Sequence, residues 1–371
     1  MGNKNLHLLW DEKITPGIID NFETVLPGQN DYIYWWEPKN KIHFAKEGEN
    51  CKVIKNEGEV PDLDYSQYTR VIIHALDPRK VKFCLHHIPN NIPVYWLMWG
   101  ADLYSLLDRK GYKLLYNNAA DKSWERRCKR LITRMGYNPK HIKEYLSIFK
   151  DREVIMVGSE EEYEIFCDYY PEYTRTLKNN PNFFYYPVEK ILGELAACEA
   201  KGNRILVGNS NSFTNNHSYA FKYLKDANLT NREITVPLSY GGSTESKELV
   251  IGEGMKLFGS QFTPLTDFLP LDRYNQIMTE AEYAVYGNWR QEAMGNILVA
   301  LYLGTKVFLS KKNPLLQIFK DMGIIIFELE DIGKDAFQVP LTKEQRKHNR
   351  RIIAERYSFA KMQENIETLF G

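Results

Sequence analysis

The stretch ILVGNSNSFTNNHSYAFKYLK (205–225) indicates how this chain is built. A short apolar run ends at Gly208, a polar loop rich in asparagine follows, and a helix-like segment begins near Ser218. A buried strand that leads through a small-residue loop into a helix is typical of an open α/β sheet, which binds ligands outside the carboxyl ends of its strands. The stretch therefore predicts an α/β fold with a binding site in the loops that follow strands.

The same alternation of strand-like and helix-like segments occurs along most of the chain. The apolar runs are continuous, as expected for parallel sheets that are covered on both faces. The pattern occurs twice, which predicts two similar α/β domains, over 1–180 and 181–342, with a cleft between them and charged helices over 343–371. Thr342 and Gln345 fit a capping box at the start of those helices. The expected strands are 5–10, 31–36, 70–76, 93–99, 153–158, 183–187, 204–209, 233–240, 255–259, 283–287, 306–310 and 323–329. The expected helices of the second half are 218–228, 243–253, 269–281, 291–303 and 314–322.

Composition excludes several classes of protein. The chain has 371 residues, with 48 Lys+Arg and 48 Asp+Glu, so its net charge gives no attraction to nucleic acid. Its five cysteines form no C-x-x-C pair, which fits a reducing cytoplasm rather than a disulfide framework or a zinc site. The start of the sequence has no apolar run of the signal-peptide kind, and the run 296–309 is shorter than the ~20 residues of a membrane span.

Three loops of the second half have the chemistry of an anion site. They are 208–217, 236–243 and 287–296, and each follows an expected strand and precedes an expected helix. Small polar side chains and the N–H groups of a helix N-terminus bind phosphate, and Arg290 adds a guanidinium group. Two alternatives remain open: the polar residues only cap their helices, and Arg290 pairs with Glu292 or Glu282.

Two features of the first half are candidates for a catalytic role and for a surface-binding role. Asp102 follows the strand that ends near Trp99 and fits either a general base or a carboxylate that caps a helix. The segment 122–152 is strongly basic and suits either the surface of an anionic membrane or a solvated helix face. The sequence contains no H-E-x-x-H and no G-x-S-x-G, which argues against zinc-dependent and serine-dependent hydrolysis.

These motifs together resemble a family of bacterial glycosyltransferases, the 4-acetamido-4,6-dideoxygalactose (Fuc4NAc) transferases of enterobacterial common antigen synthesis, glycosyltransferase family 56. The segments that carry the resemblance are YWLMWGADLYSLL (95–107), the stretch 205–225, VPLSYGGS (236–243) and NWRQEAMGNILVALYLGTKVFLSKKNP (288–314). The order and approximate spacing of these segments match the family over most of 93–320.

The resemblance implies a GT-B fold, with two Rossmann-like domains facing a central cleft. It implies transfer of a deoxyamino sugar from a dTDP-sugar to a saccharide on undecaprenyl diphosphate, without a metal or other cofactor. It also implies a peripheral enzyme on the cytoplasmic face of the bacterial inner membrane. Asp102 is the expected catalytic residue, and Trp99, Gly100 and Tyr104 are the expected acceptor-binding residues. The expected donor-binding residues are Gly208, Asn209, Ser210, Asn215, His217, Ser239, Tyr240, Gly241, Arg290, Gln291, Gly295 and Asn296.

Two other functions fit the same double-Rossmann plan. A nucleotide-sugar epimerase would act on the free nucleotide sugar, and a non-catalytic protein of polysaccharide assembly would release no nucleoside diphosphate. The segment 208–217 departs from the family pattern after Ser210, which leaves the donor sugar open.

Overall fold

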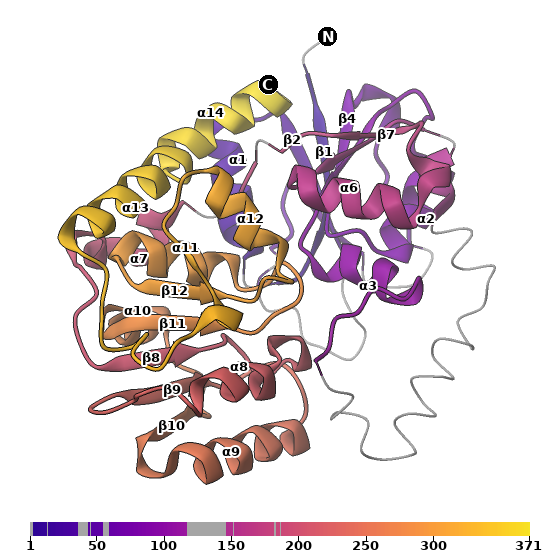
Figure 1. Ribbon diagram of the computed structural model, residues 1–371. Helices are drawn as coiled ribbons and strands as arrows, with labels where there is room; N and C mark the ends of the chain where they lie inside the picture. The colour runs from indigo at the N-terminus through magenta and orange to yellow at the C-terminus, as the bar shows by residue number, and fades with distance from the viewer. Residues whose placement is uncertain are drawn as a thin grey trace. The chain divides into compact units, whose positions relative to one another are not determined.

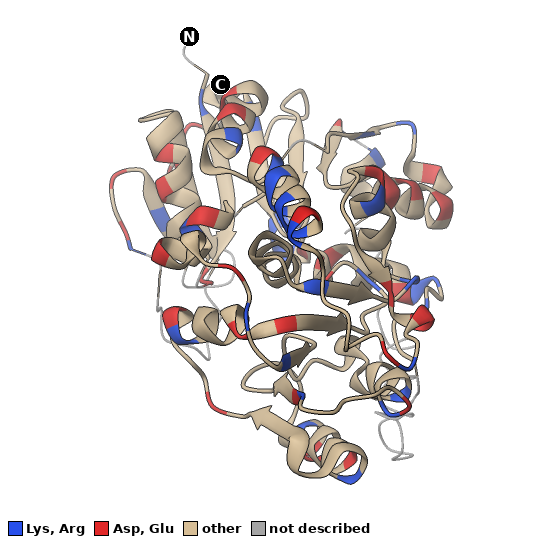
Figure 2. Ribbon diagram, turned by 60° about the vertical axis from the view of Figure 1, so that its left-hand side comes forward, with Lys and Arg blue, Asp and Glu red and all other residues tan. Residues whose placement is uncertain are grey.

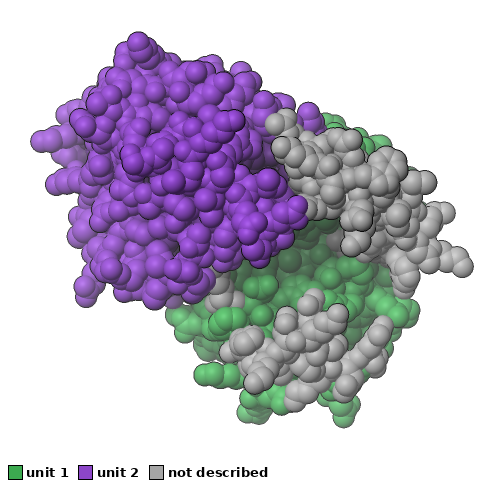
Figure 3. Space-filling model, turned by 90° about the horizontal axis from the view of Figure 1, so that it is seen from below, with its two compact units in different colours: residues 1–111, 130–185, 362–371 green, residues 112–129, 186–361 purple. Residues whose placement is uncertain are grey.

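The computed structural model describes residues 3–12, 14–35, 44, 46–54, 59–116, 146–150, 152–181, 183–185 and 187–371. The chain divides into two compact units (Figure 3). Unit 1 consists of 1–111, 130–185 and 362–371, and unit 2 consists of 112–129 and 186–361. Figure 2 shows Lys and Arg interspersed with Asp and Glu along the helices of both units, in keeping with the balanced charge of the chain.

Unit 1 is built on a seven-stranded sheet whose pairings are all parallel (Figure 1). The strands are β1 (Asn5–Trp10), β2 (Asn30–Trp35), β3 (Cys51–Ile54), β4 (Arg70–His74), β5 (Val94–Leu97), β6 (Val154–Val157) and β7 (Leu177–Asn179). The helices are α1 (Thr15–Val25), α2 (Pro78–His87), α3 (Ala101–Arg109) and α6 (Glu160–Tyr169). The strand order β3-β2-β1-β4-β5-β6-β7 reverses beside β1, as in a doubly wound fold.

Unit 2 repeats this plan with a six-stranded parallel sheet in the order β10-β9-β8-β11-β12-β13. Its strands are β8 (Arg204–Val207), β9 (Glu233–Pro237), β10 (Phe262–Leu265), β11 (Ala281–Tyr286), β12 (Lys306–Leu309) and β13 (Phe327–Glu328). Its helices are α7 (Val188–Leu192), α8 (His217–Leu224), α9 (Thr244–Phe258), α10 (Leu271–Thr279), α11 (Met294–Leu303), α12 (Pro314–Asp321), α13 (Lys343–Arg356) and the start of α14 (Phe359–Phe370). The order reverses beside β8, so the carboxyl ends of β9, β8 and β11 lie next to one another.

Burial explains why the strands of unit 2 have continuous apolar sequences. Ile205, Leu206 and Val207 of β8 are all buried, because α8 and α9 pack together on one face of the sheet and α11 packs with α7, α10 and α13. A parallel sheet that helices cover on both faces has no polar side.

The chain returns to unit 1 at its end. Phe370 is buried, and its ring centroid lies 5.3 Å from that of Phe22 and 5.3 Å from that of Tyr95. The carbonyl group of Phe370 accepts hydrogen bonds from the side chains of Asn5, at 3.3 Å, and Arg70. The last turns of α14 therefore complete the core of unit 1.

Most of the expected elements are confirmed, including the capping box of Thr342 and Gln345. Two expected strands are wrong. Residues 255–259 fall at the end of α9 instead, a helix whose own capping box at Ser243 fixes its start. The described residues of 183–187 form no strand, and the sheet of unit 1 ends with β7, which was not expected.

Candidate active site

The loops that follow β8, β9 and β11 pack backbone against backbone at the carboxyl edge of the unit 2 sheet. Two glycines allow this approach. A Cβ on Gly242, which has a φ of +62°, would lie 2.4 Å from the carbonyl oxygen of Asn211, and a Cβ on Gly287 would lie 2.9 Å from that of Asn216. A larger residue at either position would force the loops apart, because the closest atom it meets is a main-chain carbonyl oxygen.

The β8 loop is shaped by its own polar side chains. Asn215 accepts a hydrogen bond from the backbone N–H of Asn209 at 2.8 Å and donates one to Ser210 Oγ at 3.0 Å. The Asn209 side chain donates to Tyr240 Oη at 3.2 Å, and the Tyr240 carbonyl accepts from the backbone N–H of Asn211 at 2.8 Å. The asparagines therefore hold the loop in place and connect it to the loop after β9.

Arg290 forms an ion pair with Glu292, one of the two partners that the sequence left open. Its guanidinium lies 3.1 Å from the Glu292 carboxylate, and their side chains are only 13% and 11% exposed. Glu292 also accepts hydrogen bonds from Thr214 Oγ1 at 2.6 Å and Asn288 Nδ2 at 2.7 Å. Glu292 thus connects the β8 loop to the β11 loop, a role that its position two residues after Arg290 did not reveal.

The N-terminus of α11 is open. Its N-cap residue, Ala293, has a φ of +63° and supplies no side-chain cap, so the first N–H groups of the helix keep their hydrogen-bonding capacity and partial positive charge. A Cβ on Gly295 would meet only the tip of Ile191, at 3.9 Å. The arrangement has the properties of an anion site.

Three tyrosines lie near this helix end. The Tyr274 phenol accepts a hydrogen bond from Asn296 Nδ2 at 3.1 Å. Burial raises the pKa of Tyr286 well above its usual value, and the phenols of Tyr274 and Tyr240 raise it further. Among the described residues, neither Tyr286 Oη nor Asn209 Oδ1 has a hydrogen-bond partner, although both atoms are buried. A water molecule or a ligand is needed to satisfy such groups.

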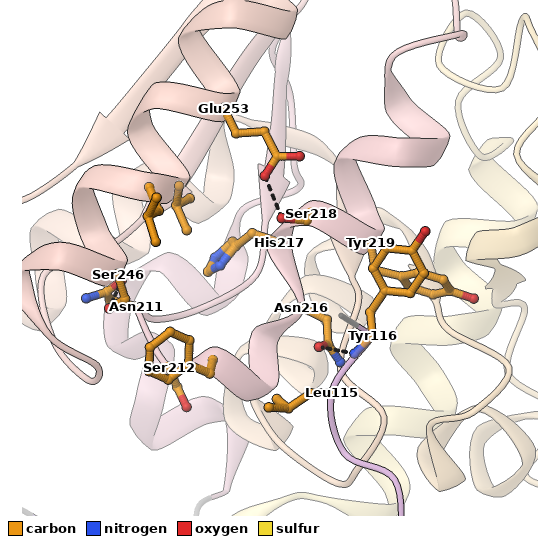
Figure 4. Close-up of a pocket in the computed structure, with 13 residues that line it drawn as sticks. Leu115, Tyr116, Asn211, Ser212, Asn216, His217, Ser218, Tyr219, Ser246 and Glu253 are labelled. Atoms are coloured by element: carbon orange, nitrogen blue, oxygen red, sulfur yellow. Dashed lines mark hydrogen bonds between the residues drawn. The ribbon is translucent and has the colours of Figure 1, made fainter. Parts of the chain in front are cut away.

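His217 begins α8 and lines a pocket (Figure 4). Its Nε2 is buried, and no hydrogen-bond partner for it occurs in the described part of the chain. The pocket lies between the β8 loop, α9 and Tyr116, and Leu249 of α9 forms part of its apolar wall. A neutral imidazole thus lies in a pocket that combines polar and apolar groups.

Burial of histidines predicts a pH dependence of stability. Burial lowers the pKa of His217 to about 4 and that of His7 to about 3 from the ordinary 6.5. The unfolded chain takes up protons below pH 6.5 while the folded protein does not, so the stability present above pH 6.5 is lost as the pH falls. We expect the free energy of unfolding to fall by about 1.4 kcal/mol per pH unit for each such histidine. Urea unfolding between pH 7 and 5 measures this slope. The variant His217→Gln should have a shallower slope. A slope equal to that of wild type would contradict the conclusion that His217 is buried and neutral in the folded protein.

Asp102 is buried in unit 1 at the first turn of α3. Its Oδ2 accepts hydrogen bonds from the backbone N–H of Leu76 at 2.8 Å and the indole N–H of Trp96 at 2.7 Å, and its Oδ1 accepts from the backbone N–H of Trp99 at 3.1 Å. Burial raises the pKa of Asp102, against the effect of these bonds. The contacts favour the interpretation of Asp102 as a residue that ties the ends of β4 and β5 together.

The expected acceptor-binding residues differ in their surroundings. Gly100 is the N-cap of α3 with a φ of +84°, and the Trp99 ring lies edge-on to Tyr185 with a centroid distance of 5.9 Å. Tyr104 is only 1% exposed, so its ring belongs to the core of unit 1. Residues 117–145, which include most of the basic segment, lie outside the described residues.

All of the expected donor-binding residues lie at this edge of the unit 2 sheet. Gly208, Asn209, Ser210 and Asn215 lie in the β8 loop and His217 at the start of α8; Ser239, Tyr240 and Gly241 lie in the β9 loop; Arg290 and Gln291 lie in the β11 loop; and Gly295 and Asn296 lie in the first turn of α11. Within the described ranges, no group of three or more His, Cys, Asp or Glu side chains is arranged to hold a metal ion. Nor does that part of the chain contain a helix long and apolar enough to cross a membrane.

Several solved structures resemble this chain in fold over nearly its whole length. Sucrose-phosphate synthase from Thermosynechococcus elongatus matches with a TM-score of 0.64 at 9% identity, over 100% of this chain and 98% of that chain. WaaG, a glycosyltransferase involved in lipopolysaccharide biosynthesis, matches with a TM-score of 0.59 at 11% identity, over 99% of this chain and 100% of that one. HepE from Anabaena, solved with UDP and glucose, matches with a TM-score of 0.59 at 11% identity, over 99% of both chains.

These likenesses define the fold as GT-B, the two-domain Rossmann-like fold of glycosyltransferases. Residues 166–361, more than half of the chain, match the family model described as 4-alpha-L-fucosyltransferase, glycosyl transferase group 56. The chain is therefore a glycosyltransferase, and it belongs to glycosyltransferase family 56.

Proposed function

We propose that this glycosyltransferase moves a deoxyamino sugar of the Fuc4NAc kind from a dTDP-sugar to a saccharide on undecaprenyl diphosphate, during synthesis of a bacterial surface polysaccharide. The family match supports this choice of reaction. The likeness in fold to WaaG, a glycosyltransferase involved in lipopolysaccharide biosynthesis, is in keeping with it.

One observation supports unit 2 as the donor-binding unit. The open N-terminus of α11 lies near two buried polar atoms that have no partner among the described residues, Tyr286 Oη at the end of β11 and Asn209 Oδ1 in the β8 loop. A diphosphate at this helix end would gain the N–H groups and partial charge of α11, and the protonated tyrosines would add donors.

The proposed reaction joins the acceptor hydroxyl oxygen to the anomeric carbon and breaks the bond from that carbon to the diphosphate. Negative charge then develops on the departing dTDP, where α11 stabilises it more in the transition state than in the bound donor. The hydroxyl proton leaves to a base, for which Asp102 is the candidate from the sequence. Its hydrogen bonds also hold it in place between Leu76, which follows β4, and Trp96 of β5.

The reaction is tested with purified protein and a panel of dTDP-, UDP- and GDP-sugars, with and without a polyprenyl diphosphate-linked saccharide. We expect release of dTDP only when the lipid acceptor is present. Conversion of the free nucleotide sugar without acceptor would indicate an epimerase, and failure to release any nucleoside diphosphate would indicate a non-catalytic protein. Binding to vesicles of anionic lipid tests the proposed peripheral location on the cytoplasmic face of the inner membrane.

Gly295→Ala separates binding from stability. The added methyl group has room in the fold, and alanine favours a helix by about 0.8–1 kcal/mol over glycine, so the free energy of unfolding should rise. The same methyl group obstructs a diphosphate at the helix end, so the KM for the donor should rise about tenfold. An unchanged KM in a stabilised variant would place the donor elsewhere.

A further inference from the structure

Two lysines lie over the ring of Trp289 in unit 2. Lys312 Nζ is 3.6 Å from the ring centroid and Lys113 Nζ is 5.2 Å from it. Trp289 follows β11, Lys312 follows β12, and Lys113 comes from a segment more than a hundred residues earlier in the chain. The fold thus gathers two ammonium groups from separate segments around one indole.

The position of Lys113 is fixed by its neighbours. Asn216 donates a hydrogen bond to the carbonyl of Leu114 at 3.0 Å and accepts one from the backbone N–H of Tyr116 at 2.9 Å. The Tyr112 hydroxyl donates to the carbonyl of Trp289 at 3.4 Å. The segment is therefore anchored on both sides of Lys113, and the exposed side chain extends from a held backbone.

The charge of this cluster is not neutralised by the described residues. Neither Lys113 nor Lys312 forms an ion pair with a carboxylate in the described ranges. Glu330 is engaged by Tyr219 Oη at 2.6 Å and Ser310 Oγ at 2.8 Å, and Glu292 is engaged by Arg290. Two like charges over one ring repel each other, and an anion between them would relieve the repulsion.

Two buried hydrogen-bond donors in the same loops have no acceptor in the part of the chain that the structure describes. They are the indole N–H of Trp289, which is 2% exposed, and the side-chain amide of Asn313, which is 1% exposed and follows Lys312 directly. A buried donor without a partner destabilises the folded protein. The positive charge of the two lysines and the two buried N–H groups therefore favour the same kind of ligand, an anion with several oxygen atoms.

We propose that Lys113, Lys312 and Trp289 form a binding site for a diphosphate group, separate from the donor site at α11. Each lysine can take one phosphate, and the indole and amide N–H groups are the available neutral donors. The identity of the molecule that bears this diphosphate rests on the proposed function. We assign it to the prenyl diphosphate of the lipid acceptor. A nucleoside diphosphate is the other molecule with the same chemistry.

The test compares wild-type protein, the double variant Lys113→Gln/Lys312→Gln and the matched control Lys311→Gln, whose lysine is exposed and next in sequence to Lys312. Binding of inorganic pyrophosphate, farnesyl diphosphate, farnesol and dTDP is measured by calorimetry. The double variant should lose about tenfold or more in affinity for pyrophosphate and farnesyl diphosphate, with dTDP affinity unchanged. The control should bind all of them as wild type does, and farnesol should bind weakly to every protein. The lysines are exposed, so the melting temperature should be unchanged.

Two outcomes would overturn the proposal. One is wild-type affinity of the double variant for both pyrophosphate and farnesyl diphosphate. The other is a loss of dTDP affinity with farnesyl diphosphate affinity retained, which would make the lysines part of the donor site. Wild-type protein that binds no dTDP, but binds pyrophosphate through both lysines, would contradict the proposed dTDP-sugar donor. The same result would support the diphosphate site.

Discussion

Asp102→Asn is expected to lower the free energy of unfolding by about 1–3 kcal/mol. The Asp102 carboxylate accepts from Leu76 and Trp96 with one oxygen and from Trp99 with the other. An asparagine has one acceptor oxygen and one NH₂ group, so in either orientation the NH₂ group faces an N–H donor. Urea unfolding gives the loss of stability, and turnover measured on the same samples shows whether activity falls by more than the unfolded fraction explains.

Asp77→Asn is the matched control, because Asp77 caps α2 in the same unit with a bond to the backbone N–H of Arg79 at 2.9 Å. Asparagine caps helices as well as aspartate, so this variant should unfold like wild type. If Asp102→Asn keeps wild-type stability and loses turnover, Asp102 acts on the acceptor hydroxyl as a base after all.

Glu292→Gln should destabilise unit 2 by about 1–3 kcal/mol and weaken donor binding. The change removes the charge that faces the largely buried Arg290 and places an amide NH₂ among donors from Thr214 and Asn288. The loops after β8 and β11 would then lose the residue that connects them. Unfolding in urea and the KM for the donor are the measurements.

A double-mutant cycle shows whether the ion pair causes this loss. Arg290→Met combined with Glu292→Gln should be less destabilising than Glu292→Gln alone, because the double variant leaves no uncompensated buried charge. Additive effects of the two substitutions would show that Glu292 acts through Thr214 and Asn288 and not through Arg290.

The sequence predicts the central strands and the edge strand β13, but it misses the edge strands β3, β7 and β10. β8 and β11 lie inside their sheet and are covered on both faces, so their apolar runs stand out. β3 and β10 are edge strands of four residues, CKVI and FTPL, and the lysine in one and the proline in the other weaken the strand signal. Residues 255–259 were mistaken for a strand because Met255 and Leu257 are apolar, although they lie exposed on α9.

The site shows a similar division. The order of strand and loop was enough to predict that Asn209, Tyr240 and Arg290 lie at the same edge, where a hydrogen bond connects the first two. The bond to Leu76 could not be foreseen, because Leu76 follows β4 and lies 26 residues before Asp102 in the chain. The local sequence shows that a polar residue lies at a strand end. The tertiary fold decides whether other residues of the protein already occupy the hydrogen-bonding groups of its side chain.

The return of the chain to unit 1 limits how the enzyme can be dissected. A recombinant fragment of residues 1–185 would lack Phe370 and would leave Phe22 and Tyr95 facing water at the place where that ring packs. Such a fragment would aggregate easily, because an exposed cluster of aromatic rings forms a hydrophobic patch that promotes association. An isolated unit 1 would have to carry residues 362–371 as a fused segment or as a synthetic peptide added separately.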